Sequence, residues 1–550
     1  MKKYSIKSIA ALALGLTMGL SACTGDFEDI NKNPYGLENK DLAIGNYFNE
    51  AQLSIYFNQS NGDWEYQIMQ NLNADMYSGY FAAPTPFGGN NNNLLYYMSN
   101  GWNNWNFNMY MIHVVKPMTT VLSFTQEDDY IAIAKVLRIA GASKITDTYG
   151  PMPYSKAMQG GLSVEYDSQE EIYKSFFADL DDAAKRMTSF IDKNGNVPAR
   201  LAFDKICGGN HTTWLRFINT MRLRLAMRVV KVDPALAKAQ AEAAVANKYG
   251  VLTDQDKNIE VRDPAIKNPL MIISRNYNDC CINASFVSIL DGYADPRLPK
   301  MVLPVGWKET DGVAQDILDQ DGKPTKSIGK YVGVRCGFVV PGGGQYKMYS
   351  IIKMPTGAAD VYSSDFPLPI MKRAEAYFLR AEGALRGWKM NGTAEELYKQ
   401  GIRTSFADYG VADKADAYIA DDTRMAADYV DPYNPALNIK AMNNVTVKFG
   451  GTDEEKLQKI ITQKWIANFP EGQEAWSEFR RTGYPKIFPV AENRSQYPEL
   501  TVIGIRRLPF TEDEKNNNKI GVESGYKHLG GQANDNIATR LWWDAKKANF

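Results

Sequence analysis

The first 22 residues determine whether this chain is secreted and where its folded part can begin. Lys2, Lys3 and Lys7 precede an apolar run from Ile9 to Leu20. A basic start followed by a short apolar stretch is typical of a secretory signal peptide. The run is too short for a stable membrane span, which needs about 20 apolar residues. The sequence therefore predicts a signal peptide over residues 1–22.

The signal ends in Leu20-Ser21-Ala22-Cys23, which resembles a bacterial lipobox. We expect cleavage before Cys23, lipidation of its sulfur, and a lipidated tether over residues 23–38. Each buried methylene of such an anchor contributes about 0.8 kcal/mol to membrane binding. The alternative is an ordinary signal peptide with a chance cysteine. On the first interpretation, residues 39–550 form a single folded domain held at a membrane.

Charge and cysteine content exclude several classes of protein. The 550 residues carry 62 Lys and Arg against 63 Asp and Glu, so the basic surface typical of nucleic-acid binding is not expected. Three histidines and no CxxC pair argue against a metal site, and no cofactor is expected. Besides Cys23, the cysteines are Cys207, Cys280, Cys281 and Cys336. The adjacent Cys280 and Cys281 permit a vicinal disulfide, but buried free thiols are favoured.

Helical periodicity accounts for most of the chain. Apolar residues recur at helical spacing over 39–80, 106–145, 168–187, 211–230, 371–409 and 452–469. Three of these stretches begin with capping boxes, Ser168 with Glu171, Thr393 with Glu396, and Thr452 with Glu455. Small residues alternate with aromatic ones in helix pairs, as in tetratricopeptide repeats. The prediction is a mainly α fold of tetratricopeptide-like helix pairs.

A different composition interrupts the helical pattern between about residues 255 and 370. Turns rich in glycine, proline and aspartate multiply there, with short β-rich runs between them. We expect an irregular lobe, rich in loops and short strands, inserted in the helical scaffold.

Residues 76–105 form the candidate ligand site. The stretch contains prolines, glycines and a run of asparagines, and is interpreted as a long loop. Its aromatic faces could stack on sugar rings or clasp peptide side chains. The alternative is that the rings pack the loop onto helices. The candidate ligand contacts are Tyr77, Tyr80, Phe81, Phe87, Asn90, Tyr96, Trp102 and Trp105.

Basic residues are concentrated in three other places. Four arginines lie within the 211–230 helix, and a buried or solvated structural role is favoured for them. They are Arg216, Arg222, Arg224 and Arg228. The pairs at 480–481 and 506–507, with the tryptophans at 542–543, are interpreted as stacked structural anchors. Ligand contacts are the alternative for these pairs.

Several of these motifs together resemble the SusD-like (SusD/RagB) family of nutrient-binding outer-membrane lipoproteins of Bacteroidetes. The resemblance is carried by the lipobox with residues 27–34, and by residues 147–157, 214–228, 295–297, 374–388, 461–485 and 541–544. It implies a mostly α-helical fold and a partner, a SusC-like TonB-dependent outer-membrane barrel that the protein covers as a lid. Ligand residues vary within the family, so none is carried over.

The leading hypothesis is a non-catalytic lipoprotein, anchored in the outer membrane and facing the exterior. It would capture oligopeptides or oligosaccharides for its transporter, with peptides slightly favoured. The alternative is a surface glycan-binding protein of a polysaccharide-utilisation system. A surface hydrolase is a remote alternative, because neither a GxSxG nor an HExxH motif occurs. A purely structural surface protein is a third possibility.

Overall fold

Helices dominate the computed structural model, which describes residues 39–56, 63–85, 87, 91–157, 163–261, 263, 268–306, 327–338, 340, 348–353 and 367–550. The segments predicted to be a signal peptide and a tether, the predicted lipidation site Cys23, and Asn90 lie outside the described residues. No helix in the described ranges is both long enough and apolar enough to cross a membrane.

The amino-terminal half is a succession of helices. They are α3 (Asn39–Ser54), α4 (Asp63–Tyr66), the π-helix η1 (Gln67–Asp75), α5 (Asn100–Tyr110), the π-helix η4 (Met111–Val115), α6 (Lys116–Phe124), α7 (Asp128–Tyr149), α8 (Gln169–Asn194), α9 (His211–Arg228) and α10 (Pro234–Ala246). The carboxy-terminal part adds α14 (Arg373–Leu385), α15 (Ala394–Asp408), α16 (Ala415–Ile419), α17 (Asp453–Asn468), α18 (Gly472–Thr482), α19 (Leu500–Ile503), α20 (Glu512–Asn517) and α21 (Lys519–His528).

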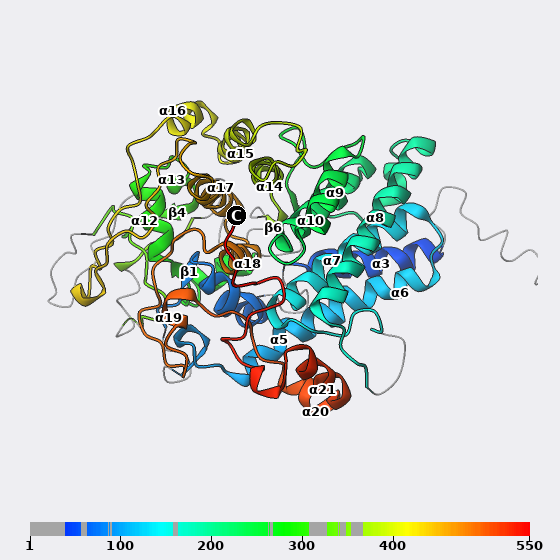
Figure 1. The fold of residues 1–550 in the computed structure, drawn as a ribbon, viewed down its shortest axis with the longest axis horizontal. Coiled ribbons are helices and arrows are strands. Elements are labelled where there is room, and N and C mark those ends of the chain that lie inside the picture. The colour runs from blue at the N-terminus through cyan, green and yellow to red at the C-terminus, as the bar shows by residue number, and fades with distance from the viewer. Residues whose placement is uncertain are drawn as a thin grey trace, which may run out of the picture.

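Neighbouring helices pack in pairs, α7 with α8, α9 with α10, and α14 with α15 (Figure 1). The predicted mainly α fold of tetratricopeptide-like pairs is confirmed. Glycines permit close approaches between helices: a Cβ on Gly401 of α15 would lie 2.8 Å from the ring of Phe378 of α14, and one on Gly141 of α7 would lie 2.6 Å from Val114 of η4. At both contacts a small residue lies opposite a large one.

The three predicted capping boxes are all present. The side chains of Ser168, Thr393 and Thr452 each accept a hydrogen bond from the backbone N–H three residues ahead, and the glutamate at that position accepts one from the backbone N–H of the capping residue. Each box satisfies amide groups that the first helical turn leaves free. The starts of α8, α15 and α17 are thus fixed locally by the sequence.

The described part of the 255–370 stretch contains short elements. They are β2 (Ile259–Val261), α11 (Pro269–Arg275), β3 (Cys281–Ile282), α12 (Ala284–Gly292), α13 (Leu298–Met301), β4 (Val302–Leu303), β5 (Ile351–Ile352) and β6 (Leu368–Met371). With β1 (Phe81–Ala82), they form three antiparallel two-stranded sheets, β1–β3, β2–β6 and β4–β5. Cys280 and Cys281 are buried free thiols, as favoured from the sequence. Helices α12 and α13 lie on the left of Figure 1, opposite α3 and α8.

Two helix boundaries differ from those expected. Helix α7 continues through Asp147 to Tyr149, and the turn begins only at Gly150, whose φ is +86°. The prolines that exclude helix come later in the sequence, so Asp147 remains helical. The loop expected to run to residue 105 ends at Ser99, because α5 begins at Asn100. Trp102 and Trp105 are therefore helical residues.

A buried network of ion pairs joins the helices at the centre of the molecule. Five cations meet five carboxylates: Arg224, Arg228, Arg386, Lys464 and Arg481 with Asp147, Glu375, Glu382, Glu474 and Glu478. They come from α7, α9, α14, α17 and α18, together with Arg386 at the end of α14. The expected structural role of Arg224 and Arg228 is confirmed, and it is a buried one.

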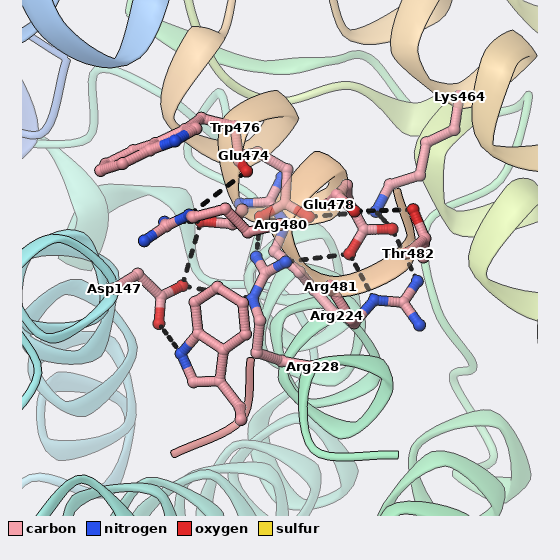
Figure 2. A network of polar contacts seen from close by, with 12 residues as sticks. Asp147, Arg224, Arg228, Lys464, Glu474, Trp476, Glu478, Arg480, Arg481 and Thr482 are labelled. Atoms are coloured by element: carbon pink, nitrogen blue, oxygen red, sulfur yellow. Dashed lines mark hydrogen bonds and ion pairs between the residues drawn. The ribbon is translucent and has the colours of Figure 1, made fainter. Parts of the chain in front are cut away.

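Arg228 occupies the middle of this network (Figure 2). Its guanidinium lies 3.2 Å from Asp147, 2.5 Å from Glu474 and 2.9 Å from Glu478. Burial alone would raise the pKa of Glu474 and Glu478, but the surrounding cations outweigh burial and hold both pKa values below the ordinary range. Both glutamates therefore remain ionised, and their contribution to stability is lost when acid protonates them.

Removing the central cation is expected to destabilise the fold strongly. Arg228→Met leaves buried carboxylates without their partner, and such a loss costs about 3–5 kcal/mol. Urea denaturation of the folded body measures the change. Arg403→Met is the matched control, because Arg403 pairs with Asp416 at the surface and exposed pairs contribute less than about 1 kcal/mol. Equal losses in the two variants would contradict a stabilising role for the network.

Candidate functional site

The candidate stretch 76–105 begins after η1 and ends inside α5. Four of its predicted contacts, Tyr77, Tyr80, Phe81 and Tyr96, are buried in the core. The hydroxyl of Tyr80 donates to the carbonyl of Trp465 at 2.5 Å, and its ring packs edge-on against Phe469. Such rings are enclosed by other side chains and contact no ligand in this conformation.

These four residues are therefore corrected to core residues, because their rings attach the stretch to the helices beneath it. Tyr77 stacks at a tilt on Trp476 of α18, and its hydroxyl donates to the carbonyl of Asn93. Tyr96 packs edge-on against Tyr77. The sequence alternative of loop rings packing onto helices holds for this half of the stretch.

The other predicted rings are half-buried and form, with one more, a surface that we call the aromatic platform: Trp64, Phe87, Trp102 and Trp105. The rings of Trp64 and Trp105 pack edge-on with their centroids 4.7 Å apart, and those of Phe87 and Trp102 do so with their centroids 5.7 Å apart. Trp102 and Trp105 lie three residues apart on α5, and hence on one side of it. Trp64, on α4, is 37% exposed.

Sequence reasoning missed Trp64 as a platform residue. It lies outside the candidate stretch and reads as one more apolar residue of a helix. The signal that could have found it is the Asn61-Gly62-Asp63 break immediately before it, which marks the start of a new element.

The π-helix η1 packs against α4 and α5, which carry the platform tryptophans, and is itself held by a buried carboxylate. Asp75 accepts hydrogen bonds from the hydroxyl of Tyr66 at 2.8 Å and from the amide of Gln70 at 3.1 Å. Asn106 of α5 donates to the carbonyl of Met69 in η1 at 3.0 Å. Burial raises the pKa of Asp75 to about 6, although the hydrogen bonds from Tyr66 and Gln70 oppose the rise.

The platform offers apolar ring faces and edges in a fixed arrangement. Such rings can stack on the C–H faces of a sugar or on apolar peptide side chains. Asn91 and Tyr97, both exposed, lie in the same stretch and supply polar groups. Within the described ranges, no three His, Cys, Asp or Glu side chains are grouped to hold a metal ion.

The buried carboxylate predicts a pH dependence of stability. Because folding raises the pKa of Asp75 from 3.8 to about 6, the folded state binds its proton more tightly than the unfolded state. The contribution of Asp75 to stability therefore falls as pH rises from about 4 to 6, by about 3 kcal/mol. Asp75→Asn cannot ionise, so the stability of this variant relative to the parent should rise over that interval.

Urea denaturation at pH 4, 5, 6 and 7 checks this expectation. The control is Asp416→Asn, which alters a carboxylate at the surface and should show no comparable trend. A difference between Asp75→Asn and the parent that stays constant with pH would contradict the assignment of a raised pKa to Asp75.

The chain is similar in sequence and in fold to known proteins. The family model for SusD-like proteins, described as SusD and RagB outer membrane lipoproteins, matches residues 29–544. A chitin-binding SusD homologue from Flavobacterium johnsoniae is 42% identical, with a TM-score of 0.84 over 92% of this chain and 100% of its own. A SusD homologue from Bacteroides vulgatus is 33% identical, with a TM-score of 0.83 over 94% and 100%.

A further solved structure, described as a chitin-binding protein, is 25% identical, with a TM-score of 0.70 over 92% of this chain and 100% of its own. None of the curated proteins searched matches this chain. The family match covers nearly the whole length and agrees with the helical architecture. The chain therefore belongs to the SusD-like family of outer membrane lipoproteins.

Proposed function

We propose that this protein is a cell-surface receptor that binds oligosaccharides on the aromatic platform and passes them to a SusC-like TonB-dependent barrel. The observation that carries the proposal is the platform itself, four partly exposed rings paired edge-on and fixed to helices. The described chitin-binding activity of a relative with 42% identity supports a glycan as the ligand.

The platform suits capture followed by release. Stacking on sugar rings is made of many weak contacts and needs few charged groups. Micromolar affinity corresponds to about −8 kcal/mol. An affinity of this order allows a ligand to be held at the surface and still to leave for the transporter. The proposed role includes no bond cleavage, so the glycan leaves unchanged.

The proposed location is the outer membrane, with lipid on Cys23 and the folded body facing the exterior. The family is one of outer membrane lipoproteins, which supports the anchor. Acting as a lid on the barrel is the part of the proposal that rests on the family resemblance alone. A complex of the two proteins, purified from the outer membrane, is the observation that tests it.

Peptides, slightly favoured from the sequence, are the competing ligand. The platform rings would serve an aromatic or proline-containing peptide as well as a sugar. The glycan is preferred because two of the solved relatives are described as chitin-binding. Both ligand classes therefore belong in the same experiment.

We expect chitin oligosaccharides to bind saturably to the body lacking residues 1–23, and a mixed peptide pool not to bind. Trp102→Ala and Trp105→Ala should each weaken glycan binding on the order of tenfold, because each removes a stacking face worth more than about 1 kcal/mol. Isothermal titration calorimetry measures both, and chromatography of the recovered glycan measures cleavage.

Trp388→Ala is the matched control, since Trp388 is another half-buried tryptophan, located beyond α14 and away from the platform. The affinity of Trp388→Ala for chitin oligosaccharides should equal that of the parent. Saturable binding of peptides alone would reverse the choice of ligand class. Glycan binding that survives both platform substitutions would exclude the platform as the site.

A further inference from the structure

A cavity lies at the end of α18, next to the ion network, and Arg481 belongs to both. Its walls are the end of α18, the turn that follows it, α19 with Arg506, and the tail from Arg540 to Lys547, closed by Lys231 after α9. Its volume is about 640 Å³, within the usual range of small-molecule sites of roughly 300–1,000 Å³. None of the platform residues lines it.

The lining of this cavity is strongly basic. Eight of its 18 lining residues are lysine or arginine, and none is aspartate or glutamate. The whole chain is balanced, with 62 basic and 63 acidic residues. Such a concentration of positive charge in a concave surface attracts negatively charged ligands.

Three of the eight cations are already paired. Arg481 lies 2.7 Å from both Glu382 and Glu478 of the ion network. Arg506 and Arg540 share the single carboxylate of Asp544, at 2.5 and 2.8 Å. One buried carboxylate therefore serves two arginines, and the local balance remains positive.

The other five are Lys231, Arg480, Lys486, Lys546 and Lys547, and none of them forms an ion pair with a described carboxylate. The ammonium of Lys547 donates to the carbonyl of Lys231 at 3.1 Å. Lys486 lies over the ring of Tyr484 at 4.7 Å. Carbonyls and rings compensate a positive charge only in part, so these groups can still accept an anion.

Arg480 is the most constrained of the five. Only 3% of it is exposed, and its guanidinium lies 3.5 Å from the ring centre of Trp476 and 4.9 Å from that of Trp543. It donates to the carbonyl of Arg506 at 2.8 Å and to the hydroxyl of Ser477 at 3.1 Å. Stacking and hydrogen bonds hold the cation in place without neutralising it.

Burial lowers the pKa of Arg480 more than Asp147 and Asp544 raise it. It likewise lowers the pKa of Lys231 to about 8, and Arg481 adds to that effect by repulsion. Each of these cations is thus held at a cost in free energy that a nearby negative charge would reduce.

Most of the other lining residues are apolar, including Phe479, Ile487, Val502 and Ile503, and Asn444 and Thr482 add neutral polar groups. The volume far exceeds that of a bare sulfate or phosphate ion, and an apolar wall suits the C–H face of a sugar ring. We propose that this cavity binds an anionic saccharide, whose carboxylate or sulfate pairs with Lys231, Arg480 and Lys486 while its ring packs on the apolar wall. This site would be separate from the platform and does not depend on the function proposed for it.

Calorimetry on the body lacking residues 1–23 tests the proposal with four titrants: a sulfated chondroitin disaccharide, an unsulfated hyaluronan disaccharide, neutral chitobiose and sodium sulfate. We expect both acidic disaccharides to bind and the other two to bind far more weakly. The double variant Lys231→Ala with Lys486→Ala should bind the acidic disaccharides more weakly, on the order of tenfold or more. Each lost charge-assisted hydrogen bond contributes more than about 1 kcal/mol to binding.

Two further variants make the result specific. Lys193→Ala with Lys414→Ala removes the same charge from exposed positions outside the cavity and should leave the affinity unchanged. Lys231→Arg with Lys486→Arg keeps the charge and should retain most of the binding. Binding of chitin oligosaccharides to Lys231→Ala with Lys486→Ala should equal that of the parent, so failure here is distinguishable from failure at the platform.

Three outcomes would overturn the proposal. One is that neither acidic disaccharide produces saturable heat with the intact body. Another is an equal loss of affinity in the cavity variant and in the exposed-lysine variant, which would indicate non-specific attraction. The third is that sodium sulfate binds as tightly as the sulfated disaccharide, which would mean that the cavity accepts the anion and not the sugar.

Discussion

The arrangement of the helices depends on the buried network of five cations and five carboxylates. Each of these charges would be costly to bury alone, so each needs its partners at hydrogen-bonding distance. Those partners come from α7, α9, α14, α17 and α18, which are separated by as many as 334 residues between Asp147 and Arg481. A helix that shifted or rotated would leave a charge unpaired. The network therefore selects one register among many that apolar packing alone would tolerate.

Helix α18 places this constraint beside the basic cavity. Arg480 and Arg481 are adjacent, and consecutive side chains on an α-helix diverge by about 100°. Arg481 consequently reaches Glu382 and Glu478, while Arg480, which also lines the cavity, stacks on Trp476 and Trp543. The paired arginine fixes the helix, and a fixed helix keeps the unpaired arginine in position.

The sequence predicts best those features that depend on interactions between residues close together in the chain. Capping boxes involve residues three apart, so Ser168, Thr393 and Thr452 identify helix starts without any tertiary information. The aromatic stretch shows the limit. Tyr80 and Trp102 are both aromatic residues near Gly and Asn, yet Tyr80 is fully buried against α17 while Trp102, on α5, is only partly buried. Only the tertiary arrangement separates them.

The cavity was beyond sequence reasoning for the same reason, since its cations are spread from Lys231 to Lys547 and form no motif. The basic pairs at 480–481 and 506–507 were visible, but both anchoring and ligand binding were open to them. The structure shows anchoring contacts for all four, through Glu382, Asp544, Asp535 and the rings of α18 and the tail. It leaves Arg480 alone among them without an ion pair to any described carboxylate.

The buried half of the aromatic stretch lies close to residues that line the cavity, although the platform and the cavity have no lining residue in common. A Cβ at Gly79, just before β1, would lie 3.0 Å from Ile487, which lines the cavity, and one at Gly504, next to the lining residue Ile503, would lie 4.0 Å from the hydroxyl of Tyr96. Gly79 and Tyr96 belong to the part of the stretch whose rings are buried in the core. The proposed platform and the proposed cavity site use different side chains, so a neutral sugar and an anionic saccharide would not compete for the same contacts.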